Sequence, residues 1–181
     1  MEETEVNGGE QNVDGLRLSL SVSASDVISP LTKASATDAN AISDLNILVY
    51  NKDNNRLVKG LYLTGAALNG FTVNNNEENK AVNYDIALQN GSYRVRVIAN
   101  AESDLSAEPF DKIDNLSYGT LDNLPKMVMS ASADDVSVSG GKGSAILSLK
   151  RIYAMISVSV NTSGLKDRTI KPLKVSLHQV P

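Results

Sequence analysis

Two pairs of adjacent carboxylates, Glu77-Glu78 and Asp134-Asp135, are the first candidates for chemistry in this chain. General acid–base catalysis needs two groups that face one another, whereas neighbouring residues of an extended chain point to opposite faces. We therefore expect both pairs to lie in solvated turns, where charged side chains are common. The single histidine, His178, is predicted to lie on the surface rather than to act as a catalyst.

Two polar loops have the composition of ligand sites. The segment 52–55 is rich in oxygen ligands but lacks the glycine and the distal bidentate glutamate that a calcium loop needs. The glycine-rich segment 140–143 suggests a phosphate cradle, but a strand is expected after it, so no helix N-terminus is available to hold an anion. We predict that both segments are hairpin turns, and we expect no bound metal or cofactor.

Composition excludes several classes of function. The chain has 181 residues, of which 41% are hydrophobic and 21% charged, which fits one or at most two globular domains. A net charge of −4 without a dense stripe of Lys and Arg argues against a nucleic-acid partner. With no cysteine and one histidine, thiol chemistry and the usual metal sites lack their ligands. We predict that the protein is not an enzyme.

The elements that position these residues are expected to be strands. Apolar residues alternate strictly in 16–22, which places Leu16, Leu18, Leu20 and Val22 on one face of an extended chain. Further alternating runs, separated by turn residues, cover 45–49, 82–86, 93–97, 136–138, 145–149, 152–160 and 173–177. This spacing predicts an all-β fold, an antiparallel β-sandwich with about seven to ten short strands.

Two regions depart from the strand pattern. Residues 103–124 lack the alternation and predict a short helix, begun near a Ser cap with an acidic first turn, that crosses an open end of the sandwich. Residues 1–14 are acidic, with nothing to bury, and predict a flexible tether. The sandwich domain is therefore expected to cover 15–175.

The first strand has a feature that suggests a function. It is followed by a small, polar loop that contains the Lys33-Ala34 bond, which a trypsin-like protease would favour. Cleavage there would take away the whole strand and leave an apolar groove flanked by unpaired backbone groups, which is costly. A strand donated by another subunit would restore the ladder and the core, which is the mode of assembly called strand complementation.

Four blocks of the sequence carry a resemblance to a known family. They read AISDLNILVYN at 41–51, NGSYRVRVIANA at 90–101, KMVMS at 126–130 and LKRIYAMI at 149–156. In their order and spacing they resemble the type V pilins, or fimbrillins, the fimbrial subunits of anaerobic Gram-negative bacteria. The resemblance implies a sandwich of transthyretin-like type and a structural subunit of a cell-surface fimbria that supports adhesion.

The resemblance also implies a route of assembly. Members of this family are exported as lipoproteins, trimmed at an Arg or Lys in the loop after the first strand, and polymerised when a neighbouring subunit's strand fills the vacated groove. Carried over to this chain, the processing bond is Lys33-Ala34 and the displaced strand is the one that contains Leu16 and Val22. The implied partners are other fimbrial subunits and a trypsin-like protease. The implied location is the outer-membrane surface, with a lipid anchor before residue 1 in the precursor, and residues 176–181 are expected to open a second domain.

Two alternatives stay open. Many stalk subunits have Arg where this chain has Lys33, and an uncleaved first strand would suit an anchor or tip subunit. A carbohydrate-binding or adhesin module on the same type of sandwich is the other alternative. Such modules commonly present an aromatic platform, whereas this chain has no Trp, two Phe and six Tyr that do not cluster.

Overall fold

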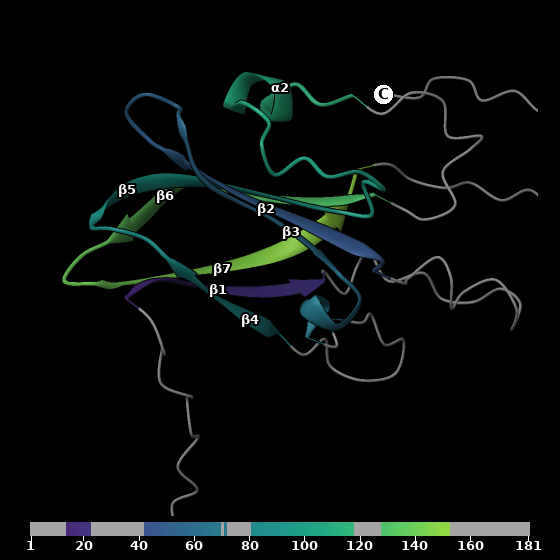
Figure 1. Ribbon diagram of the computed structural model, residues 1–181, viewed down its shortest axis with the longest axis horizontal. Coiled ribbons are helices and arrows are strands. Elements are labelled where there is room, and N and C mark those ends of the chain that lie inside the picture. Colours follow the sequence, from purple (N-terminus) through teal and green to yellow (C-terminus); the bar gives the residue numbers. More distant parts are fainter. Residues whose placement is uncertain (1–13, 23–41, 70, 72–80, 118–127, 153–181) are drawn as a thin grey trace, which may run out of the picture.

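The computed structural model describes residues 14–22, 42–69, 71, 81–117 and 128–152 (Figure 1). Its strands are β1 (Gly15–Val22), β2 (Asp44–Asn51), β3 (Leu57–Thr64), β4 (Val82–Ala87), β5 (Gly91–Ala99), β6 (Met129–Val138) and β7 (Lys142–Arg151). Two short helical elements, η2 (Gly65–Leu68) and α2 (Phe110–Asp114), complete the described part.

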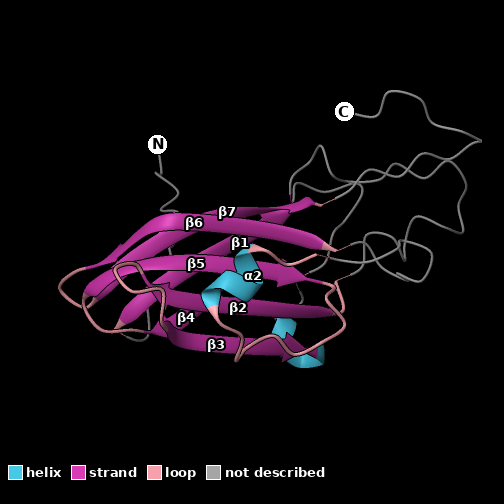
Figure 2. Ribbon diagram, turned by 90° about the horizontal axis from the view of Figure 1, so that it is seen from above, coloured by secondary structure: helices cyan, strands magenta, loops and turns pink. Residues whose placement is uncertain are grey.

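The strands form a 7-stranded sheet in the order β3-β2-β5-β6-β7-β1-β4. The sheet bends into two layers, with β1 and β4 on one side of the core and β2, β3 and β5 on the other (Figures 1 and 2). The predicted all-β sandwich is confirmed. Strand β1 pairs with β4 antiparallel and with β7 parallel, so the sheet is mixed rather than purely antiparallel.

The main core lies between the two layers and follows from the alternation read in the sequence. The strands contribute every second side chain, except that β6 steps from Ala133 to Val136 at an irregularity in its register. Burial of one large apolar side chain stabilises the fold by about 1.5–3 kcal/mol. The members with no exposed surface are Leu16, Leu18, Leu20, Leu45, Ile47, Val49, Val95, Val97, Ala99, Met129 and Leu149.

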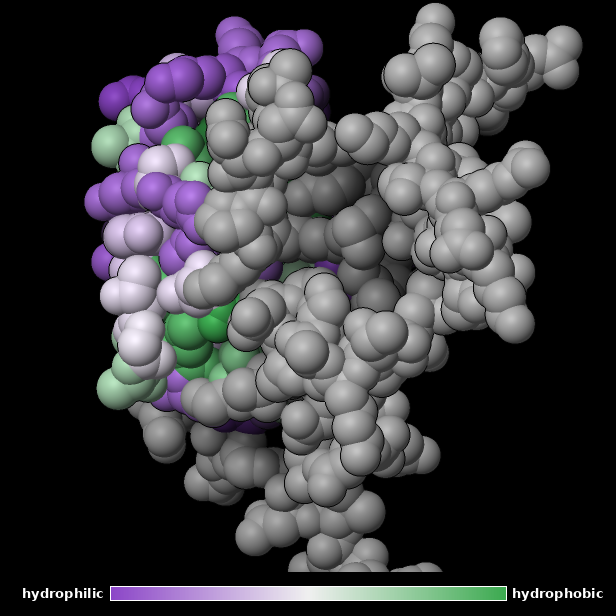
Figure 3. All heavy atoms as spheres, turned by 90° about the vertical axis from the view of Figure 1, so that its right-hand side faces the viewer, coloured by the Kyte–Doolittle hydropathy of each residue, from purple (hydrophilic) through white to green (hydrophobic). Residues whose placement is uncertain are grey.

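A second cluster covers the outer face of β2 and β5. Tyr50 of β2 and Phe110 of α2 meet edge to face with their ring centroids 5.3 Å apart, and Leu48, Ile98 and Ile113 pack around them. Strand β2 is therefore buried on both faces. Seen from the right-hand side of Figure 1, hydrophobic residues show at two heights with hydrophilic ones between them, as two separate clusters would give (Figure 3).

The predicted short helix exists, but its expected place and cap were wrong. Helix α2 lies over β2 and β5 rather than across an open end of the sandwich (Figure 2). Its N-cap is Pro109, whose ring has no polar atom to cap the helix, whereas Asp111 supplies the predicted acidic first turn. So short a helix is not stable alone, so it depends on tertiary contacts. Packing of Phe110 against Tyr50 supplies one of them.

Buried polar residues tie the segment between β5 and α2 to β2. The Oδ1 atom of Asp44 accepts a hydrogen bond from the backbone N–H of Ala101 at 3.0 Å. The Oδ1 atom of Asn46 accepts one from the N–H of Leu105 at 2.8 Å. The backbone N–H of the buried Asn100 donates to the Asp44 carbonyl at 3.1 Å. These bonds satisfy backbone groups that would otherwise be buried without partners.

Both predicted hairpin turns are confirmed. Between β2 and β3, the side-chain oxygen of Asn51 accepts hydrogen bonds from the N–H groups of Asp53 at 3.0 Å and Asn54 at 3.3 Å. Between β6 and β7, Gly140 and Gly141 take φ values of 60° and 78°. A two-residue hairpin with both central residues at positive φ favours glycine at both positions.

Several sequence predictions miss the structure or lie outside it. Strand β3 was not predicted, because Lys59-Gly60 interrupts its apolar alternation and much of it is exposed. The runs 152–160 and 173–177, the Glu77-Glu78 pair and His178 lie outside the described residues, apart from Ile152.

Two buried tyrosines predict how stability depends on alkaline pH. The hydroxyl of Tyr50 donates to the Glu108 carbonyl at 2.9 Å and that of Tyr84 to the Leu68 carbonyl at 3.0 Å. Burial raises the pKa of each tyrosine to about 12. Tyrosines of the unfolded chain ionise at about pH 10. As the pH rises, the unfolded state therefore releases these protons before the folded state does. We therefore expect the free energy of unfolding to fall as the pH rises from about 10 to about 12.

Urea unfolding at several pH values between 8 and 12, roughly, checks this prediction with Tyr84→Phe and the unmodified chain. The variant is expected to lose less of its own pH 8 stability over this range, because it has one buried hydroxyl fewer to ionise. Equal losses in both proteins would contradict the prediction.

Candidate functional site

Strand β1 comes first among the described strands of the chain but lies inside the sheet. Its residues Gly15–Val22 pair with Lys142–Leu149 of β7, and Gly15–Leu20 pair with Val82–Ala87 of β4. Both backbone edges of the strand are therefore used over most of its length. We call the space between β7 and β4 that β1 fills, bounded by 142–149 and 82–87, the β1 slot.

The apolar face of β1 closes the main core. Leu16, Leu18 and Leu20 have no exposed surface, and Val22 is 3% exposed. These four side chains share one face, as the alternation predicts, and that face is buried. The strand thus contributes both a ladder and a row of core side chains.

The polar face of β1 is matched to β4. Arg17 stands opposite Asp85 and donates from Nε to Oδ1 at 2.9 Å and from Nη2 to Oδ2 at 3.2 Å. The hydrogen bond to Asp85 raises the pKa of the Arg17 guanidinium above its ordinary value. The hydroxyl of Ser19 donates to Oδ1 of Asn83, the residue opposite it on β4. The alternation predicts only the apolar face of the strand, so neither of these polar pairs was predicted.

A glycine fixes the first residue of the strand. Gly15 has φ of +147°, and a Cβ atom there would lie 2.1 Å from the carbonyl oxygen of Ile86. Its N–H donates to the Gly141 carbonyl at 2.8 Å, and the N–H of Gly141 donates to Oδ1 of Asn90 at 2.9 Å. The start of β1 is thus locked to the turns that join β6 to β7 and β4 to β5.

In chain order, the other end of β1 precedes the predicted processing bond. Lys33 and Ala34 lie outside the described residues, so their place in the fold is left as a prediction. Val22 ends β1 at the edge of the sandwich where β6 begins with Met129 and β7 ends with Arg151 (Figure 1).

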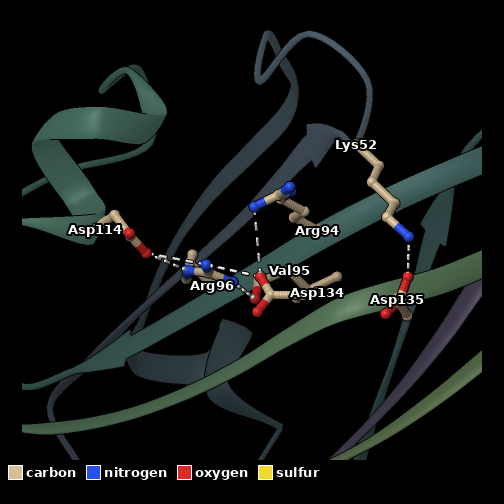
Figure 4. A network of polar contacts seen from close by, with 7 residues as sticks. All are labelled: Lys52, Arg94, Val95, Arg96, Asp114, Asp134 and Asp135. Atoms are coloured by element: carbon tan, nitrogen blue, oxygen red, sulfur yellow. Dashed lines mark hydrogen bonds and ion pairs between the residues drawn. The ribbon is translucent and has the colours of Figure 1, made fainter.

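A charge network on the outer face of β5 and β6 corrects another prediction (Figure 4). Asp134 and Asp135 were expected in a solvated turn, but they lie within β6 at an irregularity in its register with β5. The Nη2 atom of Arg96 lies 2.8 Å from Oδ1 of Asp134 and 2.9 Å from Oδ1 of Asp114 in α2. Lys52 forms an ion pair with Asp135. A β-bulge re-aims side chains in this way, and a strict period of two cannot reveal it.

This network has a structural use. The guanidinium carbons of Arg94 and Arg96 lie 5.3 Å and 5.0 Å from the centroid of the Phe110 ring. Cations over an aromatic face attract it, so the two arginines help to hold α2 on the sheet. Both aspartates are paired with cations rather than with each other, so they do not form an acid–base pair.

Among the described residues, no group of three or more His, Cys, Asp or Glu side chains is placed to hold a metal ion. No helix in the described part of the chain is long and apolar enough to cross a membrane.

The chain is similar to several solved structures. The chain resembles a fimbrial assembly protein from Parabacteroides distasonis, with 13% identity, a TM-score of 0.46, and coverage of 76% of this chain and 52% of that chain. It also resembles the tip fimbrial protein Mfa3 from Porphyromonas gingivalis, with 12% identity, a TM-score of 0.42, and coverage of 73% and 47%. The chain thus spans about half the length of these solved structures. No curated protein sequence matches it.

The sequence matches the family described as major fimbrial subunit protein (FimA) over residues 16–168. The match begins at Leu16 in β1 and covers every described strand that follows. It confirms the fimbrillin resemblance seen in the four sequence blocks. Because the match spans most of the chain, this protein belongs to the FimA family of major fimbrial subunits.

Proposed function

We propose that the protein is a non-enzymatic structural subunit of a cell-surface fimbria, assembled by protease-triggered exchange of its first strand. The observation that carries this proposal is the position of β1, which comes first among the described strands yet lies between β7 and β4. A single break in the chain after Val22 would leave the strand held by non-covalent contacts alone. Family membership supports the fimbrial part of the proposal.

The energetics of an empty β1 slot favour its refilling. Loss of β1 would uncover the core that Leu16, Leu18 and Leu20 now close. Each large apolar side chain that returns stabilises the domain by about 1.5–3 kcal/mol. Buried backbone groups of β4 and β7 left without partners would cost about 1–3 kcal/mol each. A strand from a neighbouring subunit would recover both terms, which explains how a durable polymer forms.

The remaining parts of the proposal concern processing and partners. The bond expected to be cut is Lys33-Ala34, by a protease of trypsin-like specificity. The partners are other fimbrial subunits, and the location is the outer-membrane surface, with a lipid anchor ahead of residue 1 in the precursor. An uncut first strand would instead make the protein an anchor or tip subunit.

The described aromatic side chains favour this proposal over a glycan-binding module. Tyr50, Tyr84, Tyr93 and Phe110 are all buried. Tyr62 is 37% exposed, with no second exposed ring beside it in the described ranges. Sugar recognition by stacking needs exposed aromatic faces, so the described surface offers no platform of that kind.

Limited proteolysis tests the trigger. We expect trace trypsin to cut after Lys33 and to leave residues 1–33 bound to the rest of the chain until an added peptide covering residues 12–24 displaces them. Native mass spectrometry measures both steps, and Lys33→Gln is the control that should remain uncut at this bond. A bond that resists trypsin while other sites are cut would contradict the processing step. It would favour the uncleaved anchor or tip subunit.

Truncation of the β1 apolar face tests its part in holding the domain. We expect Leu18→Ala to lower the free energy of unfolding by about 2–5 kcal/mol, because Leu18 has no exposed surface and its removal leaves a cavity. Urea unfolding measures the change. Ser21→Ala, on the opposite face of the same strand, should alter stability by less than about 0.5 kcal/mol. Similar effects of the two substitutions would contradict this role of the apolar face.

A further inference from the structure

We propose that the β1 slot selects its occupant by two features at one end, one steric and one charged. A strand from a neighbouring subunit that replaces β1 must carry glycine at the position of Gly15 and a basic residue at that of Arg17, and it must run parallel to β7. This inference rests on the proposed function, because it specifies which strand the exchange accepts.

The apolar face alone cannot set the register of an incoming strand. Side chains of a strand repeat every two residues, so a slip of one residue turns the apolar set to solvent. A slip of two residues, however, places leucine on leucine, because Leu16, Leu18 and Leu20 are identical and equally buried. Something other than the core must therefore distinguish registers that differ by two residues.

The glycine position rejects these slipped registers. A Cβ atom at Gly15 would lie 2.1 Å from the Ile86 carbonyl oxygen and 2.6 Å from the backbone nitrogen of Leu88. A slip of two residues brings either Arg17 or Val13 to this point, and both carry a side chain. The same position needs a backbone N–H to donate to the Gly141 carbonyl, so proline does not fit either.

The carboxylate of Asp85 favours a basic residue at the position of Arg17. It belongs to β4, so it stays when β1 leaves, and it would lose the bidentate contact from Arg17. Bidentate pairing between a guanidinium and a carboxylate is both strong and geometrically specific. Asn83 extends the pattern by accepting from the hydroxyl of Ser19, which calls for a small donor at that point.

The ladders of β1 with its two neighbours also set the direction of the strand. Gly15 and Arg17 lie at the end of the slot where the turn between β6 and β7 closes, and the pairs with β4 end at Leu20. A strand in the reverse direction would pair antiparallel with β7 and parallel with β4, so it would reproduce neither ladder of β1. The occupant we infer therefore reads glycine, apolar, basic, apolar, small polar, apolar, in the direction of β1.

A displacement experiment tests the inference. A recognition sequence for a site-specific protease is inserted after Lys33 in the full chain, so that the cut does not depend on trypsin. After cleavage, both pieces stay in solution and labelled peptides covering residues 12–24 compete for the slot. The peptides are the natural sequence, one with Arg17 and Ser21 exchanged, and one with Gly15→Ala. The exchanged peptide has the same composition and the same apolar face as the natural one.

We expect the natural peptide to displace β1 and the other two to bind at least about tenfold more weakly, as loss of a bidentate charged pair or a backbone clash implies. In the Asp85→Asn chain, the difference between the natural and the exchanged peptide should shrink to within about threefold, because the charged partner is gone. Asp53→Asn, in the exposed turn between β2 and β3, is the matched control and should preserve the full difference.

Equal binding of all three peptides would overturn the inference and leave strand exchange intact. A preference for the natural peptide that survives Asp85→Asn would overturn the role of Asp85. If no peptide displaces β1 at any concentration, strand exchange itself fails, and the inference fails with it.

Discussion

The insertion of β1 between β7 and β4 is the constraint on which the rest of the sandwich depends. Without it, β4 would have no partner in the sheet order and the main core would lie open along one side. Parallel pairing of β1 with β7 brings together the first and the last described strands. Such pairing needs a long connection, and here that connection contains every other described strand.

The second apolar cluster does not depend on β1. Its buried members come from β2, β5, α2, the segment between β5 and α2, and Val128, and none belongs to β1. Asp44 and Asn46 tie that segment to β2, and Arg96 binds α2 through Asp114. The layer formed by β2, β3 and β5 thus carries its own packing on its outer face. The proposed exchange of β1 would therefore disturb one face of this layer and spare the packing on the other.

How far the sequence predicts this structure depends on what a period of two can show. Alternation in 16–22 predicts the strand and its buried face, because burial of every second residue is all that it needs. Alternation is the same in both directions, so it does not show that β1 runs parallel to β7. It also assumes an uninterrupted strand, which is why the bulge at Asp134 was read as a turn and β3, broken at Lys59-Gly60, was missed.

The residues of β1 outside its apolar face, about which the alternation says nothing, are the ones that give β1 a unique register in the sheet. Leu16, Leu18 and Leu20 supply most of the strand's burial, but they are interchangeable in a two-residue slip. Gly15 and Arg17 contribute little apolar area and yet differ from every residue that a slip would bring to their places. Affinity and specificity are thus divided between the two faces of one strand. In the proposed exchange, the apolar face would determine how firmly an occupant is held, and the polar face with its leading glycine would determine which occupant fits and in which register.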